Sequence, residues 1–212
     1  MMITPQVDVS ARLGIARDQG QRPTCLVFAL SDLNAEAGGV GHLSAEFLCH
    51  HAAKIAGNWQ PGRGFQMDHV LCAVRNPGQP IETLYPYQPN GHDTPLTVPS
   101  GDFELFASPT ARQEDLTAAE VVKHLPDGKP VGLVVQVCQA LMTPKDGVIE
   151  FDPFVIPNQY HALIGVGLGV NSDTGEGYVL VRNSWGEAWG VAGHAWLPTA
   201  LLEIILVEGF LI

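Results

Sequence analysis

The sequence changes from helix-type to strand-type patterning near its middle, and this change restricts the possible folds more than any other feature. In the first half, segments 24–37, 43–56 and 62–76 have helix-type sequences separated by glycine-containing breaks. After about residue 112, short apolar runs rich in β-branched residues alternate with turn sequences, which is typical of strands. We therefore expect an α+β fold in which a helical first part is followed by a β-rich second part.

The helical segments carry signals at their ends. Segment 24–37 begins apolar on nearly all sides of a helix, which predicts burial in the middle of the protein, and the pair Gly38-Gly39 ends it. Ser44 is the expected N-cap of the second helix. Residues 77–109 are rich in Pro, Gly, Asn and Asp, so an extended loop is predicted there.

The second half starts as a helix and continues as strands. Thr117 and Glu120 have the spacing of a capping box, which predicts a helix start. The segment NSDTGEG has the composition of a turn and joins two strand-type segments into a hairpin. Strands are predicted at residues 130–138, 161–170, 177–185 and 193–198, and in the C-terminal run 201–212.

Composition restricts the partners and the location. The chain has 212 residues, enough for two lobes with a shared core, and we place the helical lobe at about 12–108 and the β-rich lobe at about 109–212 of one domain, dividing near 100–112. A formal net charge of −11 argues against nucleic acid or an anionic membrane as the partner, because both reward Lys and Arg. No signal peptide or membrane helix is indicated. Four cysteines in a chain of this size do not suggest a disulfide scaffold, so reduced thiols and a cytoplasmic location are expected.

Cys25 lies at the junction between a turn-rich loop and the first helix. In the sequence QGQRPTCLVFA, Thr24 is a plausible N-cap and Cys25 falls in the first helical turn. Unpaired backbone N–H groups and the positive end of the helix dipole stabilise a thiolate at such a position. A lone cysteine there is also explained as a small buried apolar residue, so its partners decide the question.

His161 and Asn183 are the expected partners of this thiol. His161 opens one predicted strand and Asn183 closes the next, so the hairpin would place them side by side. An imidazole beside a thiol can take its proton, and an amide oxygen can accept the other ring N–H and fix the tautomer. Cys25, His161 and Asn183 together form a complete nucleophilic set, although a strand-end histidine and a turn asparagine each have an ordinary structural explanation.

Five segments occur together in the order and spacing of one known family: DQGQRPTCLVFA, LSAEFL, YPY, YHALIGVG and VRNSWGEAWG. That family is the papain-like cysteine peptidases, which the chain resembles over residues 17–197. The resemblance implies a helical lobe, an antiparallel β-barrel-like lobe and an active-site cleft between them. It also implies hydrolysis of peptide bonds without a cofactor, with Cys25 as nucleophile, His161 as its imidazolium partner and Asn183 orienting that ring. Gln19 and the backbone N–H of Cys25 would bind the oxyanion.

The resemblance further suggests residues that contact a peptide or protein substrate. In the loop QPGRGFQMD, Gly64 would hydrogen-bond the substrate backbone. Phe65 and Met67 would form apolar walls for the side chain two positions before the cut, with Arg63 near the rim or pointing to water.

The resemblance also assigns positions to the two tryptophans of the segment VRNSWGEAWG. Trp185 is expected to shield the hydrogen bond between His161 and Asn183 from water. Trp189 is expected to line the leaving-group side of the cleft. Ordinary core packing is the alternative explanation for both.

Three positions depart from the family pattern. Arg22 stands where disulfide-bonded members have cysteine, Pro23 where glycine is common, and Leu26 where tryptophan is usual. Pro23 stiffens the loop. Because Cys25 lies near the N-terminus, we expect a bacterial-type member without a pro-segment, controlled by an inhibitor or activator protein or by restricted specificity.

Other functions on the same residues remain open. One is a dedicated acyl-transfer or processing enzyme, for example a transamidase. The other is a catalytically silent binding module that kept the fold.

A metal site is the remaining candidate. Cys49, His50 and His51 are adjacent, and His69 and Cys72 share a helical face. Both cysteines fit the core face of an amphipathic helix, so no metal is expected. The glycines of GVGLGV alternate along a strand and indicate close packing of another element, not a phosphate loop.

Overall fold

The computed structural model describes residues 2–90, 96 and 99–212, so part of the predicted 77–109 loop lies outside the described residues. The α-helices are α1 (Cys25–Gly38), α2 (Ala45–Ala56), α3 (Met67–Arg75), α4 (Ala118–His124), α5 (Gln139–Met142) and α6 (Thr199–Ile205). The strands are β1 (Ile3–Asp8), β2 (Ala111–Gln113), β3 (Val131–Cys138), β4 (Val155–Asn171), β5 (Gly177–Arg182), β6 (His194–Pro198) and β7 (Leu206–Leu211). Among the described residues, no helix is long and apolar enough to cross a membrane.

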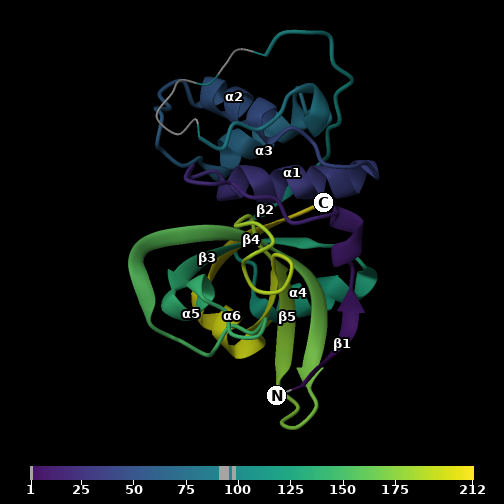
Figure 1. Cartoon of the computed structure of the whole chain (residues 1–212), viewed down its shortest axis with the longest axis vertical. Coiled ribbons are helices and arrows are strands. Elements are labelled where there is room, and N and C mark those ends of the chain that lie inside the picture. Colours follow the sequence, from purple (N-terminus) through teal and green to yellow (C-terminus); the bar gives the residue numbers. More distant parts are fainter. Residues whose placement is uncertain (1, 91–95, 97–98) are drawn as a thin grey trace.

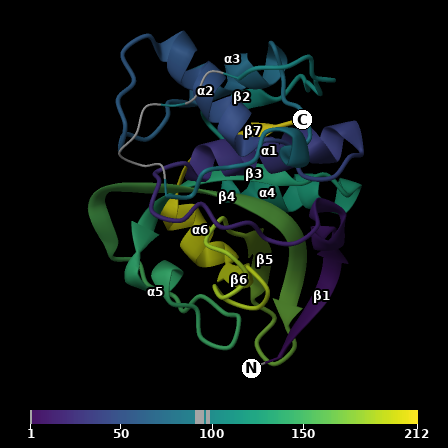
Figure 2. The same ribbon diagram turned by 45° about the horizontal axis from the view of Figure 1, so that its top comes forward.

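Helices α1, α2 and α3 form one lobe, and the strands with α4, α5 and α6 form the other (Figures 1 and 2). The described strands build one antiparallel sheet in the order β2-β7-β3-β4-β5-β6, with β1 paired to β4. Helix α1 lies between the other two helices and the sheet, and its apolar side chains share one core with α2, α3 and the facing residues of β4 (Figure 1). The α+β prediction is confirmed.

The helix-end signals act largely as the sequence predicts. Helix α1 is buried from Leu26 to Ala35 and ends at Gly38-Gly39, where Gly39 is left-handed. The Ser44 hydroxyl accepts the N–H of Phe47, and the Thr117 to Glu120 capping box is complete in α4. Thr24 occupies the N-cap position of α1 without capping through its side chain.

The N-terminal strand β1 was not predicted, and it explains two of the three glycines of β4, Gly167 and Gly169. It pairs with the second half of β4, where a Cβ atom on Gly167 would lie 2.5 Å from the carbonyl oxygen of Val7. A Cβ atom on Gly169 would lie 2.7 Å from the side chain of Ile3. Because no other residue fits this approach without displacing β1, the prediction that these glycines admit a neighbouring element is confirmed.

Three local predictions are wrong. His161 does not open its strand, because β4 begins at Val155 and pairs with β3 through a bulge near residues 136–138. The C-terminal run is not a strand throughout, since its first part forms α6. Leu201, Leu202 and Ile205 have helical spacing and are fully buried in the second core.

The third wrong prediction concerns Cys72, which is exposed. The buried face of α3 is formed by Met67, Val70, Leu71, Ala73 and Val74, and Cys72 lies outside it. Cys49 is buried in α2 as predicted. No group of three or more His, Cys, Asp or Glu side chains with metal-binding geometry occurs in the described part of the chain.

A buried ion-pair network joins the two lobes. Asp32 of α1 accepts hydrogen bonds from Arg17 Nη2 at 2.5 Å and from Arg182 Nε of β5 at 2.9 Å. The guanidinium of Arg182 also donates to the backbone carbonyls of Leu13, Gly14 and Ile15. The Arg182 side chain is only 1% exposed. Through these hydrogen bonds it holds the N-terminal segment and α1 against the sheet.

Candidate active site

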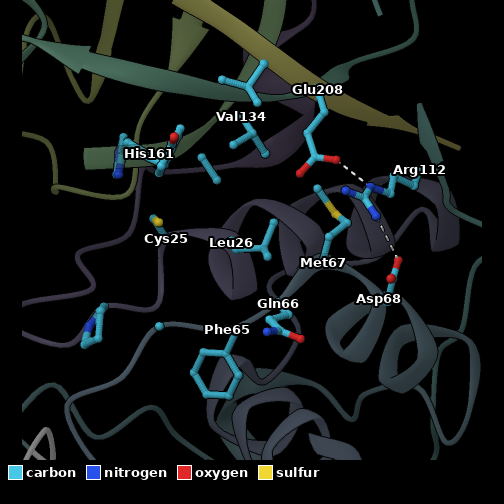
Figure 3. Close-up of a pocket in the computed structure, with 15 residues that line it drawn as sticks. Cys25, Leu26, Phe65, Gln66, Met67, Asp68, Arg112, Val134, His161 and Glu208 are labelled. Carbon is cyan, nitrogen blue, oxygen red and sulfur yellow. Dashed lines mark hydrogen bonds and ion pairs between the residues drawn. The ribbon is translucent and has the colours of Figure 1, made fainter. Parts of the chain in front are cut away.

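The predicted nucleophile and histidine meet where the two lobes face each other. Cys25 is the first residue of α1, and His161 projects from β4 toward it (Figure 3). Beside them opens a cavity of about 530 Å³. Its lining comes from both lobes and consists of Pro23, Cys25, Leu26, Gly64, Phe65, Gln66, Met67, Asp68, Arg112, Val134, Tyr160, His161, Ala162, Val207 and Glu208.

The His161 ring is held by Asn183, which directly follows β5. Ring atom Nε2 lies 2.7 Å from Asn183 Oδ1, and both residues are buried. The same oxygen accepts the backbone N–H of Ser184 at 2.7 Å. Because a backbone N–H can only donate, this bond fixes the orientation of the amide, and His161 must then carry its proton on Nε2 toward Asn183. The other ring nitrogen is left for Cys25.

The environment of Cys25 favours the thiolate. Burial alone would raise the pKa of this thiol, but the charge of His161 and a hydrogen bond with His161 lower it below the ordinary value. Hydrogen bonds with the backbone of Ala162 and Leu26 act in the same direction. By contrast, burial raises the pKa of Cys49 and of Cys138. A thiolate beside an imidazolium is the arrangement required for nucleophilic attack on a carbonyl carbon.

Trp185 lies against the His161 ring, with ring centroids 4.4 Å apart. This is the place expected of a side chain that shields the bond between His161 and Asn183 from water. Trp189 is buried, donates its indole N–H to the carbonyl of Leu141 at 3.0 Å and lies outside the lining of this cavity, so its place on the leaving-group side stays a prediction. Its ring lies nearly perpendicular to that of Trp185, with centroids 6.2 Å apart.

Gln19 is buried and is held by several hydrogen bonds. Its backbone N–H donates to the carbonyl of Ser184 at 2.9 Å, and its side-chain oxygen accepts the Ser184 hydroxyl at 2.7 Å. Its Nε2 donates to the carbonyl of Arg22 at 2.7 Å. An amide nitrogen carries two hydrogens, so this bond occupies one of them. Gln19 does not line the cavity, and its role as an oxyanion donor stays a prediction.

In the glycine-rich loop, three of the residues predicted to contact a substrate lie at the cavity, and these contacts stay a prediction. Gly64, Phe65 and Met67 line the cavity. Arg63 is exposed and lies outside the lining, which agrees with the interpretation that it points to water. Leu26 of α1, Val134 of β3 and Val207 of β7 add further apolar walls to the cavity.

The end of the cavity away from Cys25 is charged, which the sequence did not reveal (Figure 3). Arg112 of β2 pairs with Glu208 of β7, and also lies 3.2 Å from Glu114 and 3.5 Å from Asp68. Two of these carboxylates, Asp68 and Glu208, line the cavity together with the one guanidinium, so the formal charge of this end is negative. Arg112 and Glu208 come from strands far apart in the sequence, and the pairing of β2 with β7 brings them together.

Comparison with known proteins agrees with this geometry. The family model described as papain family cysteine protease matches residues 42–201, which include His161 and Asn183. The chain belongs to the papain family of cysteine proteases. The match begins after Cys25, so the assignment of the nucleophile depends on the geometry and not on the family model.

The chain is also similar to individual proteins in sequence and in fold. A cathepsin L-like peptidase of Aedes aegypti is 28% identical over 188 residues, covering 84% of this chain and 53% of that protein. The chain therefore spans about half the length of the curated relatives it matches. Its fold is similar to that of xylellain, a cysteine protease from Xylella fastidiosa, with a TM-score of 0.76, 18% identity and coverage of 100% and 86%. It is also similar to a Carica candamarcensis cysteine protease in complex with E-64, with a TM-score of 0.69, 20% identity and coverage of 94% and 92%.

Proposed function

We propose that this chain is a cysteine peptidase that hydrolyses peptide bonds through a thioester on Cys25. The observation that carries the proposal is the row formed by Cys25, His161 and Asn183 beside an open cavity, with the pKa of the thiol lowered by the imidazole. The same row argues against a silent binding module, because a binding surface does not need an activated thiol.

The proposed reaction follows from the positions of these groups. The Cys25 thiolate attacks the scissile carbonyl carbon, and a C–S bond forms while the carbonyl oxygen becomes an oxyanion. The oxyanion accepts the backbone N–H of Cys25, which is unpaired at the helix start, and the second N–H of Gln19. His161 gives its proton to the leaving nitrogen, and the C–N bond breaks.

The second half of the reaction releases the acid. Water attacks the thioester carbonyl while His161 accepts its proton, and the C–S bond breaks to return the thiolate. Asn183 stays hydrogen-bonded to Nε2 throughout, so the ring keeps the nitrogen facing Cys25 available for both proton transfers.

Specificity is proposed to come from the side chain two positions before the cut. Leu26, Phe65, Met67 and Val134 give the cavity apolar walls, which favour an apolar side chain. The net negative end at Glu208 disfavours an acidic one. We propose slow turnover of generic peptides, with the stiff residue Pro23 beside the nucleophile as the supporting feature.

A reducing, cytoplasmic location and a bacterial-type character complete the proposal. All four cysteines are free thiols, and Arg22 stands where disulfide-bonded members have cysteine. The fold likeness to xylellain supports the bacterial-type character.

The experiment is a fluorogenic peptide library varied at the second position before the cut. The expected result is hydrolysis of peptides with apolar residues there, abolished by Cys25→Ala. Rapid digestion of casein, or a strict demand for a basic residue, would overturn the proposed specificity. Failure of the folded protein to cleave any library peptide would overturn the peptidase proposal.

A further inference from the structure

Arg22 is a buried arginine in the loop that leads to Cys25. Its side chain is 3% exposed, and both of its terminal nitrogens face the carboxylate of Glu46, which is 4% exposed. Nη1 also donates to the carbonyl of Gln88 at 3.0 Å. The guanidinium lies over the ring of Tyr87, with Cζ 4.6 Å from the ring centroid. The charge is therefore paired, hydrogen-bonded and stacked at once.

This cluster of Arg22, Glu46 and Tyr87 contacts Gln19 of the proposed site and Thr24, the residue before the nucleophile. The carbonyl of Arg22 accepts the side-chain N–H of Gln19 at 2.7 Å. The Tyr87 hydroxyl donates to the carbonyl of Gln19 at 2.9 Å and lies 2.8 Å from the hydroxyl of Thr24, the residue before the nucleophile. Gln19 is thus held by the cluster at its backbone and at its amide.

Glu46 connects the cluster to the rigid part of the helical lobe. It is a buried residue in the first turn of α2, and its carboxylate also accepts the backbone N–H of Gln88 at 3.2 Å. A guanidinium and a carboxylate that meet through two pairs of atoms fix an orientation as well as a distance. The loop carrying Gln19 and Cys25 is in this way tied to α2 by a non-covalent contact.

We propose that Arg22, through its pairing with Glu46 and stacking on Tyr87, is a positioning residue that fixes Gln19 as the oxyanion donor. The inference rests on the proposed peptidase function. If the cluster relaxes, the carbonyl that holds the Gln19 amide moves, and the second N–H of that amide no longer points at the developing oxyanion. The thiolate of Cys25, which depends on His161 and on the helix start, keeps its reactivity.

The test separates the oxyanion site from the nucleophile. The variant Arg22→Met/Glu46→Leu removes both buried charges together, so neither is left unpaired. Tyr87→Phe keeps the ion pair and removes only the hydroxyl. Peptide hydrolysis needs the oxyanion donor, whereas alkylation of Cys25 by iodoacetamide needs the thiolate and forms no oxyanion. Both rates are measured per folded molecule.

The expected result is a fall in kcat of about 10-fold or more for the double variant, since loss of one oxyanion donor typically reduces kcat by about 100- to 1,000-fold. Tyr87→Phe should lower kcat by less. KM and the alkylation rate should stay within about 3-fold of wild type. In a Gln19→Ala background the same changes should have no further effect on kcat, because the donor is already gone.

The matched control is Lys145→Met/Glu150→Leu, which removes an exposed ion pair by the same substitutions and should leave kcat unchanged. Wild-type kcat in the folded double variant would overturn the inference, whatever the effect of Tyr87→Phe. So would alkylation that falls in parallel with kcat, or a full additional loss in the Gln19→Ala background. A wild-type protein that is alkylated at Cys25 but cleaves no peptide would instead overturn the proposed function.

Discussion

The side-chain oxygen of Asn183 lies 2.7 Å from Nε2 of His161, and its orientation is fixed by the backbone N–H of the next residue. The asparagine therefore determines which ring nitrogen carries the proton and which faces Cys25. Two residues that are 22 positions apart are brought together because β4 and β5 form a hairpin.

Asn183→Ala is expected to lower kcat without unfolding the chain. A hydrogen bond to a charged group contributes about 1.5–3 kcal/mol, so we expect a loss of roughly 10- to 100-fold as the His161 ring loses its fixed orientation. Steady-state kinetics and circular dichroism measure the two effects. Asn58→Ala, at an exposed asparagine, is the control. Wild-type kcat in a folded Asn183→Ala protein would contradict the orienting role.

The site residues found from the sequence are those with a local signature. Cys25 marks a loop-to-helix junction, and His161 and Asn183 belong to strands joined by a short polar turn. The juxtaposition of His161 and Asn183 follows from the geometry of this hairpin, even though β4 begins earlier than predicted.

The residues that the sequence did not reveal depend on long-range packing. Arg112 and Glu208 are 96 positions apart and meet only because β2 pairs with β7. The partner of Arg22 could not be inferred either, since nothing near Glu46 distinguishes it from an exposed acidic residue of a helix. The same limit explains α6, whose apolar run fits a strand or a helix until the buried surface beside it is known.

Asp32→Asn is expected to destabilise the protein in a pH-dependent way. Burial alone would raise the pKa of Asp32, but the charges of Arg17 and Arg182 lower it below its usual range. Breaking a buried pair typically reduces the free energy of unfolding by about 3–5 kcal/mol. A lowered pKa makes this contribution complete above the unfolded value of about 3.9, and it is lost as the pH falls through the folded value.

Urea unfolding of wild type and Asp32→Asn at pH 7 and near pH 3 measures this contribution. The difference in the free energy of unfolding between wild type and Asp32→Asn should be large at pH 7 and smaller near pH 3. Asp115→Asn, at an exposed aspartate, should leave stability unchanged at both. An equal difference in the free energy of unfolding at both pH values would show that the charge of the Asp32 carboxylate does not stabilise the contact between the lobes.

Glu208→Gln is expected to change specificity and not catalysis. The end of the cavity holds one guanidinium and several carboxylates, so an acidic substrate side chain meets like charge. Removing one charge should improve kcat/KM for glutamate at the second position before the cut, relative to leucine, by about 5-fold, corresponding to about 1 kcal/mol. Glu203→Gln, an exposed change on α6, is the control. An unchanged ratio of kcat/KM for glutamate relative to leucine would show that the substrate side chain at this position does not lie near Glu208.

Alkylation by iodoacetamide should report the lowered pKa of Cys25. The thiolate population rises as pH rises through that pKa, so Cys25 should stay reactive at pH values where an ordinary thiol is protonated. The exposed Cys72 provides an accessible comparison in the same molecule. In His161→Ala the fast reaction should shift to higher pH. Equal rates for Cys25 and Cys72 near pH 6 would contradict the thiolate–imidazolium pair.

The most direct test of the central claim, that Cys25 is the nucleophile of a peptidase, is labelling with the epoxide E-64 followed by mass spectrometry and a peptide assay. One covalent adduct is expected, on Cys25, with hydrolysis lost in proportion to labelling and no adduct in Cys25→Ser. Absence of an adduct on the folded wild-type protein, or labelling that is equal on Cys72 and leaves hydrolysis intact, would contradict the account.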